Sequence, residues 1–86
     1  MRENNYCRVC GLYREDKPWG EDGVTPTYEI CPCCGTEFGY EDINIESIKD
    51  KRNNWLANGM NWFLKKEKPE IWNSKEQLNH IPEQYR

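Results

Sequence analysis

The sequence has no long apolar run, and it contains a single histidine. No segment approaches the about 20 apolar residues that a membrane-spanning helix needs, and residues 1–5 hold no apolar core of the kind found in secretory signals. We therefore expect a cytoplasmic protein with no membrane segment. The lone histidine, His80, has no second histidine with which to share a metal or a proton, so we expect an ordinary surface side chain.

The chain is also short, and little of it is hydrophobic. Its 86 residues are 36% hydrophobic and 31% charged, so a core of its own would give only marginal stability. Aromatic residues nevertheless make up 13% of the sequence, which is more than disordered chains contain. We therefore expect one folded domain over residues 1–86 that depends on a cross-link.

Five cysteines can supply that cross-link. Four of them form two Cys-x-x-Cys pairs, each followed at once by glycine: Cys7, Cys10 and Gly11, then Cys31, Cys34 and Gly35. Paired cysteines in a reducing compartment bind metal more often than they form disulfides, and an odd total fits four ligands and a spare thiol. A glycine with positive φ after each pair lets backbone N–H groups turn toward the sulfurs. A disulfide framework is the alternative.

Four thiolates around one ion form a closed shell, which predicts a structural metal site. Catalytic zinc keeps one position open for water and usually has histidine or carboxylate ligands. No spacing in the sequence assigns an acid, a base or a nucleophile, so we expect no enzymatic activity. Four sulfur ligands suit both zinc and iron. We favour Zn²⁺ because nothing in the sequence indicates a redox partner, and iron is the alternative.

The fifth cysteine, Cys33, lies inside the second pair. Its spacing from Cys31 is too tight for the usual metal-binding turn, so we expect a spare side chain that points off the turn. A reactive or sensing thiol beside the metal is the alternative.

The pattern around the cysteines predicts a small α+β metal-bound domain. Residues 6–40 are expected to form a metal ribbon, with an exposed charged loop over 14–27. Short antiparallel strands are expected at 27–30 and 36–40, on either side of the second cysteine pair. Two or three short helices should follow this ribbon.

The first of these helices is expected over residues 44–58. Asn44 or Ser47 can cap its beginning, and Asn58 with Gly59 is a natural end. Spacings of three and four residues predict a buried face made of Ile45, Ile48, the stem of Arg52, Trp55 and Leu56.

Residues 60–86 are expected to form a tryptophan-rich segment with short helices. The apolar run from residue 60 favours a second helix to about residue 66. Ser74 and Gln77 match a capping box, so we expect Ser74 to begin a last helix that runs to about His80. The tryptophans should join the helices to the ribbon, and one or two of them can serve as partner anchors.

Charge is unevenly distributed. Residues 1–46 carry 4 basic and 10 acidic side chains, hence −6, whereas residues 47–86 carry 8 basic and 5 acidic, hence +3. An acidic metal half does not favour nucleic acid, which needs clustered basic side chains. The alternative requires a patch made of Lys49, Lys51, Arg52, Lys65, Lys66 and Lys68. We expect the aromatic residues near the cysteines to cover the metal rather than stack on bases: Tyr6, Tyr13, Trp19, Tyr28, Phe38 and Tyr40.

The cysteine pairs resemble those of rubredoxin-like zinc ribbons. The matching residues are Tyr6-Cys-Arg-Val-Cys-Gly11 with Tyr13, and Ile30-Cys-Pro-Cys-Cys-Gly35 with Phe38. The resemblance implies a small three-stranded antiparallel sheet around a metal held by two cysteine turns, with Cys7, Cys10, Cys31 and Cys34 as ligands.

Over residues 6–63 the chain is also similar to the bacterial cysteine-rich CPCC proteins. The shared features are a Cys-x-x-Cys-Gly turn, a Tyr-Glu-Ile-Cys-Pro-x-Cys run, two acids, and a helix with an Arg-Asn-aromatic element before glycine. Here they are Cys7 to Gly11, Tyr28 to Cys34, Glu41 with Asp42, and Arg52 to Trp55 with Gly59. The Cys-Pro-Cys-Cys run lies in the second pair here and in the first pair of that family. The resemblance implies fold and metal rather than a particular function.

These observations favour a non-enzymatic, zinc-stabilised module that binds an unidentified protein partner. A small immunity or antitoxin-like protein is one form of this hypothesis. The alternatives are an iron electron carrier of the rubredoxin kind and a nucleic-acid-binding zinc ribbon.

Overall fold

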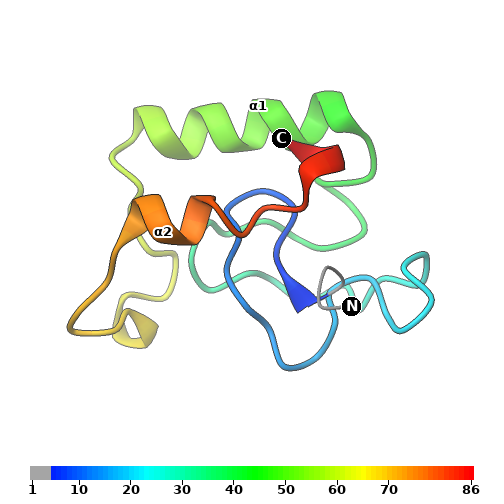
Figure 1. Cartoon of the computed structure of the whole chain (residues 1–86), viewed down its shortest axis with the longest axis horizontal. Helices are drawn as coiled ribbons and strands as arrows, with labels where there is room; N and C mark the ends of the chain where they lie inside the picture. The colour runs from blue at the N-terminus through cyan, green and yellow to red at the C-terminus, as the bar shows by residue number, and fades with distance from the viewer. Residues whose placement is uncertain (1–4) are drawn as a thin grey trace.

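The computed structural model describes residues 5–86, which carry four short helical elements on a scaffold of loops. The elements are the α-helices α1 (Ile45–Ala57) and α2 (Ser74–Leu78) and the 3-10 turns η2 (Lys65–Glu67) and η3 (Glu83–Tyr85). In Figure 1, α1 runs along one side of the molecule, and the loops that carry the cysteines lie beneath it. The η3 turn lies against α1.

The two cysteine pairs fold into the same hydrogen-bonded turn. We call residues 6–13 the first knuckle and residues 30–37 the second knuckle. In each, the N–H of the first cysteine donates to the carbonyl five residues later at 2.8 Å, and the glycine N–H donates to that cysteine's carbonyl at 2.9 Å. An antiparallel bridge closes the open end of each knuckle: Tyr6 with Tyr13, and Ile30 with Glu37. The two frames are displaced by 24 residues, since 31 − 7 = 24.

The predicted strands at 27–30 and 36–40 are wrong in their extent. In the described chain each contributes a single bridging residue. Tyr28 has a φ of 63°, and Gly39 has a φ of 89°. Both values lie in the left-handed region, which interrupts the extended backbone that a strand needs.

Helix α1 confirms the helix predicted over residues 44–58. Of the two possible caps, Asn44 is the one used: its side chain accepts from the Ser47 N–H at 2.8 Å. Gly59 follows the helix with a φ of 92°, which suits its predicted role at the end.

The predicted buried face of α1 is half wrong. Ile48 and Trp55 are buried, whereas Ile45 and Leu56 are exposed. The buried pair lies seven residues apart, on one narrow stripe of the helix. Because the knuckles beneath α1 are small, only this stripe finds atoms to pack against.

The helix predicted over 60–66 is also wrong, and only the η2 turn forms near its end. Met60 has a φ of 56° directly after Gly59, so two left-handed residues reverse the chain. The Phe63 N–H then donates to the Cys33 carbonyl, and the Leu64 N–H donates to the Pro32 carbonyl, both at 2.9 Å. Hydrogen bonds to the second knuckle therefore override the helical tendency of this apolar run.

Helix α2 begins at the predicted residue but has a different cap and is shorter. The side chain of Asn73, rather than that of Ser74, accepts from the Glu76 N–H at 3.1 Å. The helix ends at Leu78, two residues before the predicted end near His80. With the cap shifted by one residue, Gln77 is free to point into the core, where it is buried.

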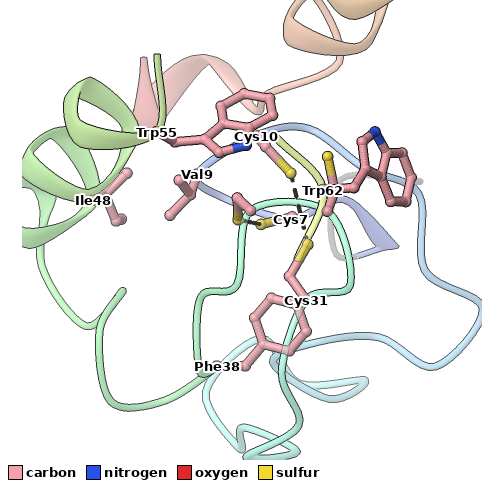
Figure 2. Packing of buried hydrophobic residues seen from close by; sticks show 10 residues of the cluster. Cys7, Val9, Cys10, Cys31, Phe38, Ile48, Trp55 and Trp62 are labelled. Atoms are coloured by element: carbon pink, nitrogen blue, oxygen red, sulfur yellow. Dashed lines mark hydrogen bonds between the residues drawn. The ribbon is translucent and has the colours of Figure 1, made fainter. Parts of the chain in front are cut away.

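Sulfur forms the centre of the core, as Figure 2 shows. Ten buried residues make one cluster: Cys7, Val9, Cys10, Cys31, Cys33, Cys34, Phe38, Ile48, Trp55 and Trp62. They come from both knuckles, from Phe38 directly after the second knuckle, from α1 and from the segment after it. The three regions predicted at 6–40, 44–58 and 60–86 therefore share this core.

The aromatic residues near the knuckles divide into two groups. Phe38 is buried as expected, whereas Tyr13, Tyr28 and Tyr40 are exposed, so the expectation that all of them cover the cysteines is wrong. Each exposed tyrosine lies outside a Cys-x-x-Cys turn, at or beyond the bridge that closes it. Residues after the second knuckle, among them Ile48, Trp55 and Trp62, supply much of the cover.

Candidate metal centre

The structure brings together the four cysteines that the sequence assigned to a metal. Their sulfur atoms all lie within 4.8 Å of one another, and the residues are buried. Two contacts cross between the knuckles, with 3.7 Å from Cys7 Sγ to Cys34 Sγ and 3.7 Å from Cys10 Sγ to Cys31 Sγ. All five cysteines of the chain are free thiols, so the disulfide alternative is not the arrangement seen here.

The sulfur positions fit one tetrahedral ion. A tetrahedral ion bonded to sulfur at about 2.3 Å places its four sulfurs about 3.8 Å apart. The separations of 3.7 Å match this value, and the 4.8 Å limit on all of them is compatible with sulfurs around one ion. The cluster can therefore hold a metal ion, and sulfur ligands of this kind are shared by zinc and iron.

The thiols of the cluster differ in their acidity. Burial raises the pKa of Cys7 and Cys10 well above the ordinary value, since a thiolate loses its hydration in the core. Hydrogen bonds with the thiols of Cys10, Cys34 and Cys7 instead lower the pKa of Cys31 well below it. A divalent cation stabilises thiolate ligands, so its binding releases the protons that the thiols carry.

Thr36 gives the second knuckle a polar contact that the first knuckle lacks. Its hydroxyl lies 3.0 Å from Cys34 Sγ, and the threonine is fully buried. When Cys34 is a thiolate the hydroxyl is the donor. The equivalent residue of the first knuckle is Leu12, whose side chain has no hydrogen to donate. A hydroxyl residue directly after the second Cys-Gly is a sequence signal for this contact, which the spacing of the cysteines did not reveal.

Arg52 of α1 supports the first knuckle through hydrogen bonds to its backbone carbonyls. Its Nε donates to the Val9 carbonyl at 2.8 Å and its Nη2 to the Arg8 carbonyl at 2.9 Å; Nη2 also donates to the Tyr85 carbonyl. Burial lowers the Arg52 pKa, an effect opposed by attraction to the nearby thiols. A guanidinium keeps its charge in proteins. Arg52 thus places a positive charge beside the sulfur cluster.

Backbone groups give the equivalent support to the second knuckle. The acceptors there are the Cys33 and Pro32 carbonyls, which correspond to those of Val9 and Arg8 after the displacement of 24 residues. Their donors are the N–H groups of residues 63 and 64. One knuckle is therefore held by a side chain and the other by an extended segment.

Gln77 links both knuckles to α2. Its Nε2 donates to the Cys10 carbonyl at 3.2 Å and lies 3.3 Å from Cys33 Sγ. Its Oε1 accepts from the Trp72 indole at 2.7 Å. The sequence pattern assigned Gln77 to a capping box at the surface. No local signal indicates that its side chain is buried, or that it contacts Cys10, which lies 67 residues earlier in the chain.

Cys33 is not one of the four clustered sulfurs, in agreement with its predicted status as a spare thiol. Its side chain does not point into solvent, because the residue is fully buried. After the displacement of 24 residues it corresponds to Val9, which is also fully buried. Cys33 therefore packs as a small apolar side chain, and the structure gives no exposed thiol at this position.

A second set of contacts joins the charged loop to the first knuckle. The Arg8 guanidinium lies 4.0 Å from the Trp19 ring centre and 4.4 Å from that of Tyr85. The Trp19 indole donates to the buried Asp42 carboxylate at 2.9 Å, and the Gly39 N–H donates to the same carboxylate at 2.7 Å. Trp19 thus anchors the loop through Asp42 and Arg8.

His80 lies at the surface, where its ring is 5.2 Å from that of Tyr6. It does not belong to the one group of potential metal ligands found among residues 5–86. In the same part of the chain, no helix has the length and apolar character needed to cross a membrane.

Two proteins of Bacillus subtilis (strain 168) are similar to this chain. The uncharacterized protein YozI is 34% identical over 71 residues, and the uncharacterized protein YoaQ is 33% identical over 70 residues. Each alignment covers 63% of this chain and 58% of the relative, so the chain spans little more than half of their length. No family model matches the sequence, and no solved structure matches it.

Proposed function

We propose that the protein is a non-enzymatic, zinc-stabilised module of a reducing cytoplasm that acts by binding another protein. The observation that carries the proposal is the closed set of four buried sulfurs, because it fits one tetrahedral ion and leaves no ligand position for water. The repeated turn around each cysteine pair supports a rubredoxin-like ribbon, and the acids and the Arg-Asn-aromatic helix after it support membership of the CPCC family.

Metal analysis and chelation test the structural role. We expect about one zinc ion per chain in protein purified without added metal, and loss of the helical circular-dichroism signal when a chelator removes it. Structural zinc supplies on the order of 10 kcal/mol to the folding of such small domains. A fold that keeps its helices and its cooperative unfolding without metal would overturn the proposal.

The same purification separates zinc from iron. Iron bound by four thiolates absorbs visible light and cycles between two oxidation states, whereas zinc does neither. Stoichiometric iron with a reversible redox couple would replace the zinc module by an electron carrier.

Exposed apolar side chains in the segment after α1 support a protein partner. Phe63 is 56% exposed and Ile71 is 94% exposed, with the exposed Leu64 between them. The sequence predicted one or two tryptophans as partner anchors, whereas Trp55 and Trp62 are buried and Trp19 and Trp72 are half-buried. The partner surface proposed here is therefore made of these three apolar residues.

Affinity capture from the source cell tests this surface. We expect the wild-type protein to retain one stoichiometric partner, and Phe63→Asp with Ile71→Asp to lose it. Val24→Asp, at an exposed apolar residue of the charged loop, is the control and should retain it. An immunity or antitoxin role further predicts that the captured partner is toxic when expressed alone. Equal capture by all variants would exclude this surface.

Two contacts weigh against the nucleic-acid alternative. Arg52 points its guanidinium at backbone carbonyls, and Lys51 Nζ lies 3.5 Å from a Glu41 carboxylate oxygen. Both residues belong to the basic patch that this alternative requires. Binding of DNA or RNA at low salt that weakens steeply as salt rises would restore it.

A further inference from the structure

The four clustered cysteines are not equally shielded. Cys7, Cys10 and Cys31 are 0% exposed, whereas Cys34 retains 8% of its surface. Cys34 also lines a surface hollow of about 200 Å³, together with Lys51, Asn54, Trp55, Asn58 and Asn61. The sulfur cluster therefore has one side on which small molecules can approach it.

The hollow has a mixed polar and apolar lining, with the Lys51 side chain at its edge. Three asparagines line it and are linked by hydrogen bonds: Asn58 Nδ2 donates to the Asn54 carbonyl, and Asn61 Nδ2 donates to the Asn58 carbonyl, each at 2.8 Å. Lys51 lies 3.5 Å from Glu41, and about a third of each side chain is exposed. A volume of this size holds several water molecules, so a hydrated ion or a small chelating molecule fits.

We propose that this hollow is the route by which the metal enters and leaves, and that Cys34 is the ligand that exchanges first. The hollow would admit a small anionic molecule with a metal-binding thiol or carboxylate. This inference rests on the proposed metal site.

The charges explain the preference for an anion. Four thiolates with one divalent ion carry a net charge of about −2, which repels an anionic competitor. Arg52 also lies beside the cluster, but its guanidinium donates to backbone carbonyls and it does not line the hollow. Lys51 offsets that repulsion at the mouth of the hollow, and asparagine N–H groups can donate to carboxylate oxygens. A competitor that displaces the Cys34 sulfur meets the ion while the other three ligands still hold it. Exchange can then proceed one ligand at a time.

Two chelators of different charge test the route on the metal-loaded full chain. EDTA is a polyanion and TPEN is neutral, and the rate of metal release to each can be followed with a fluorescent indicator. Lys51→Met should slow release to EDTA about fivefold, the effect of one charge in contact with an anion in water, and leave release to TPEN unchanged. Asn54→Phe fills the hollow and should slow release to both.

Two neighbouring substitutions serve as matched controls. Lys49→Met removes a charge from an exposed position of α1, and Asn53→Phe adds a ring beside Asn54, and neither residue lines the hollow. Both variants should release metal at the wild-type rate. Release that is unchanged in Asn54→Phe, or slowed as much in Asn53→Phe, would overturn the route.

Alkylation identifies the first ligand independently. Limited iodoacetamide treatment, in which a sulfur–carbon bond forms and iodide leaves, should label Cys34 before the other clustered cysteines when peptides are mapped by mass spectrometry. Earlier labelling of Cys7, Cys10 or Cys31 would overturn the assignment. A chain that holds no tightly bound ion would overturn the proposed function and this inference together, whereas a loaded protein with equal release rates in all variants overturns this inference alone.

Discussion

The two knuckles have the same internal frame but different surroundings. Each closes with the same two hydrogen bonds and a positive-φ glycine. Behind them, the first meets the guanidinium of Arg52, and the second meets backbone N–H groups of residues 63 and 64. The Cys-x-x-Cys-Gly motifs therefore determine the two turns, whereas residues elsewhere in the chain supply the hydrogen-bond donors to the backbone carbonyls of those turns. Substitutions in each knuckle can separate these two contributions.

The largest expected effect is common to both knuckles. Cys10→Ser and Cys31→Ser each remove one sulfur from the cluster, and we expect both to lose tight metal binding and cooperative unfolding, at a cost that approaches the roughly 10 kcal/mol of structural zinc. Metal content and thermal unfolding measure this loss.

Cys33→Val is the control, because valine is the equivalent residue, Val9, of the first knuckle. This variant should keep the metal, with a change in stability under about 1.5 kcal/mol. Loss of metal in this control would show that Cys33 is a ligand.

The next effect distinguishes side-chain from backbone support. Arg52→Met leaves buried carbonyls of the first knuckle without a donor and should destabilise the metal-loaded protein by about 3 kcal/mol in urea unfolding. Phe63→Ala keeps the backbone donors of the second knuckle and should cost about 1 kcal/mol. Lys49→Met is the charge control. If Arg52→Met cost no more than this control, the guanidinium would not support the knuckle.

The two glycines should respond differently to the same added methyl group. At Gly11 a Cβ would overlap the backbone carbonyl of Gln77, whereas at Gly35 it would lie 3.1 Å from the Phe63 ring, which can move. We expect Gly11→Ala to cost about 3 kcal/mol and Gly35→Ala about 1 to 2 kcal/mol.

Gly59→Ala measures the part of the destabilisation that comes from the left-handed backbone alone, without steric overlap of the added methyl group. Its φ is 92°, and the added Cβ would meet only Asn61 Nδ2, at 3.9 Å. We expect about 1 kcal/mol in the same unfolding experiment. An equal cost at Gly11 and Gly59 would contradict the close packing of α2 on the first knuckle.

The smallest effect concerns the hydroxyl beside Cys34. Thr36→Val keeps the shape of the side chain but removes its hydrogen bond to the sulfur, so we expect metal affinity to fall by a factor equivalent to about 1 kcal/mol. Competition with a chromogenic chelator measures it. Thr25→Val, in the exposed loop, should leave the affinity unchanged. An identical affinity in both variants would show that the hydroxyl does not stabilise the thiolate.

Local patterns predicted the parts of the fold that local forces dictate. The Cys-x-x-Cys-Gly spacing identified the four clustered cysteines, and Asn44 with Gly59 marked the ends of α1. These features depend on backbone geometry within a few residues.

Contacts between distant parts of the chain were not predictable in this way. The run after Gly59 has an apolar composition typical of a short helix, yet the carbonyls of the second knuckle hold it extended. Gln77 has the spacing of a surface cap, yet it donates to Cys10. In both cases a donor or acceptor far away in sequence decides the outcome, and periodicity carries no information about it.

The hydrogen bond from Gln77 to the Cys10 carbonyl has a consequence for biosynthesis. All four clustered cysteines precede residue 35, and much of their cover, including Gln77, is synthesised later. At usual rates of translation the 43 residues from Cys34 to Gln77 (77 − 34 = 43) take about 2 to 9 s to appear. During that interval the nascent thiols are open to an incoming ion. The order of synthesis therefore allows an ion to bind before the cover forms, and the hollow beside Cys34 remains the proposed route of exchange in the folded protein.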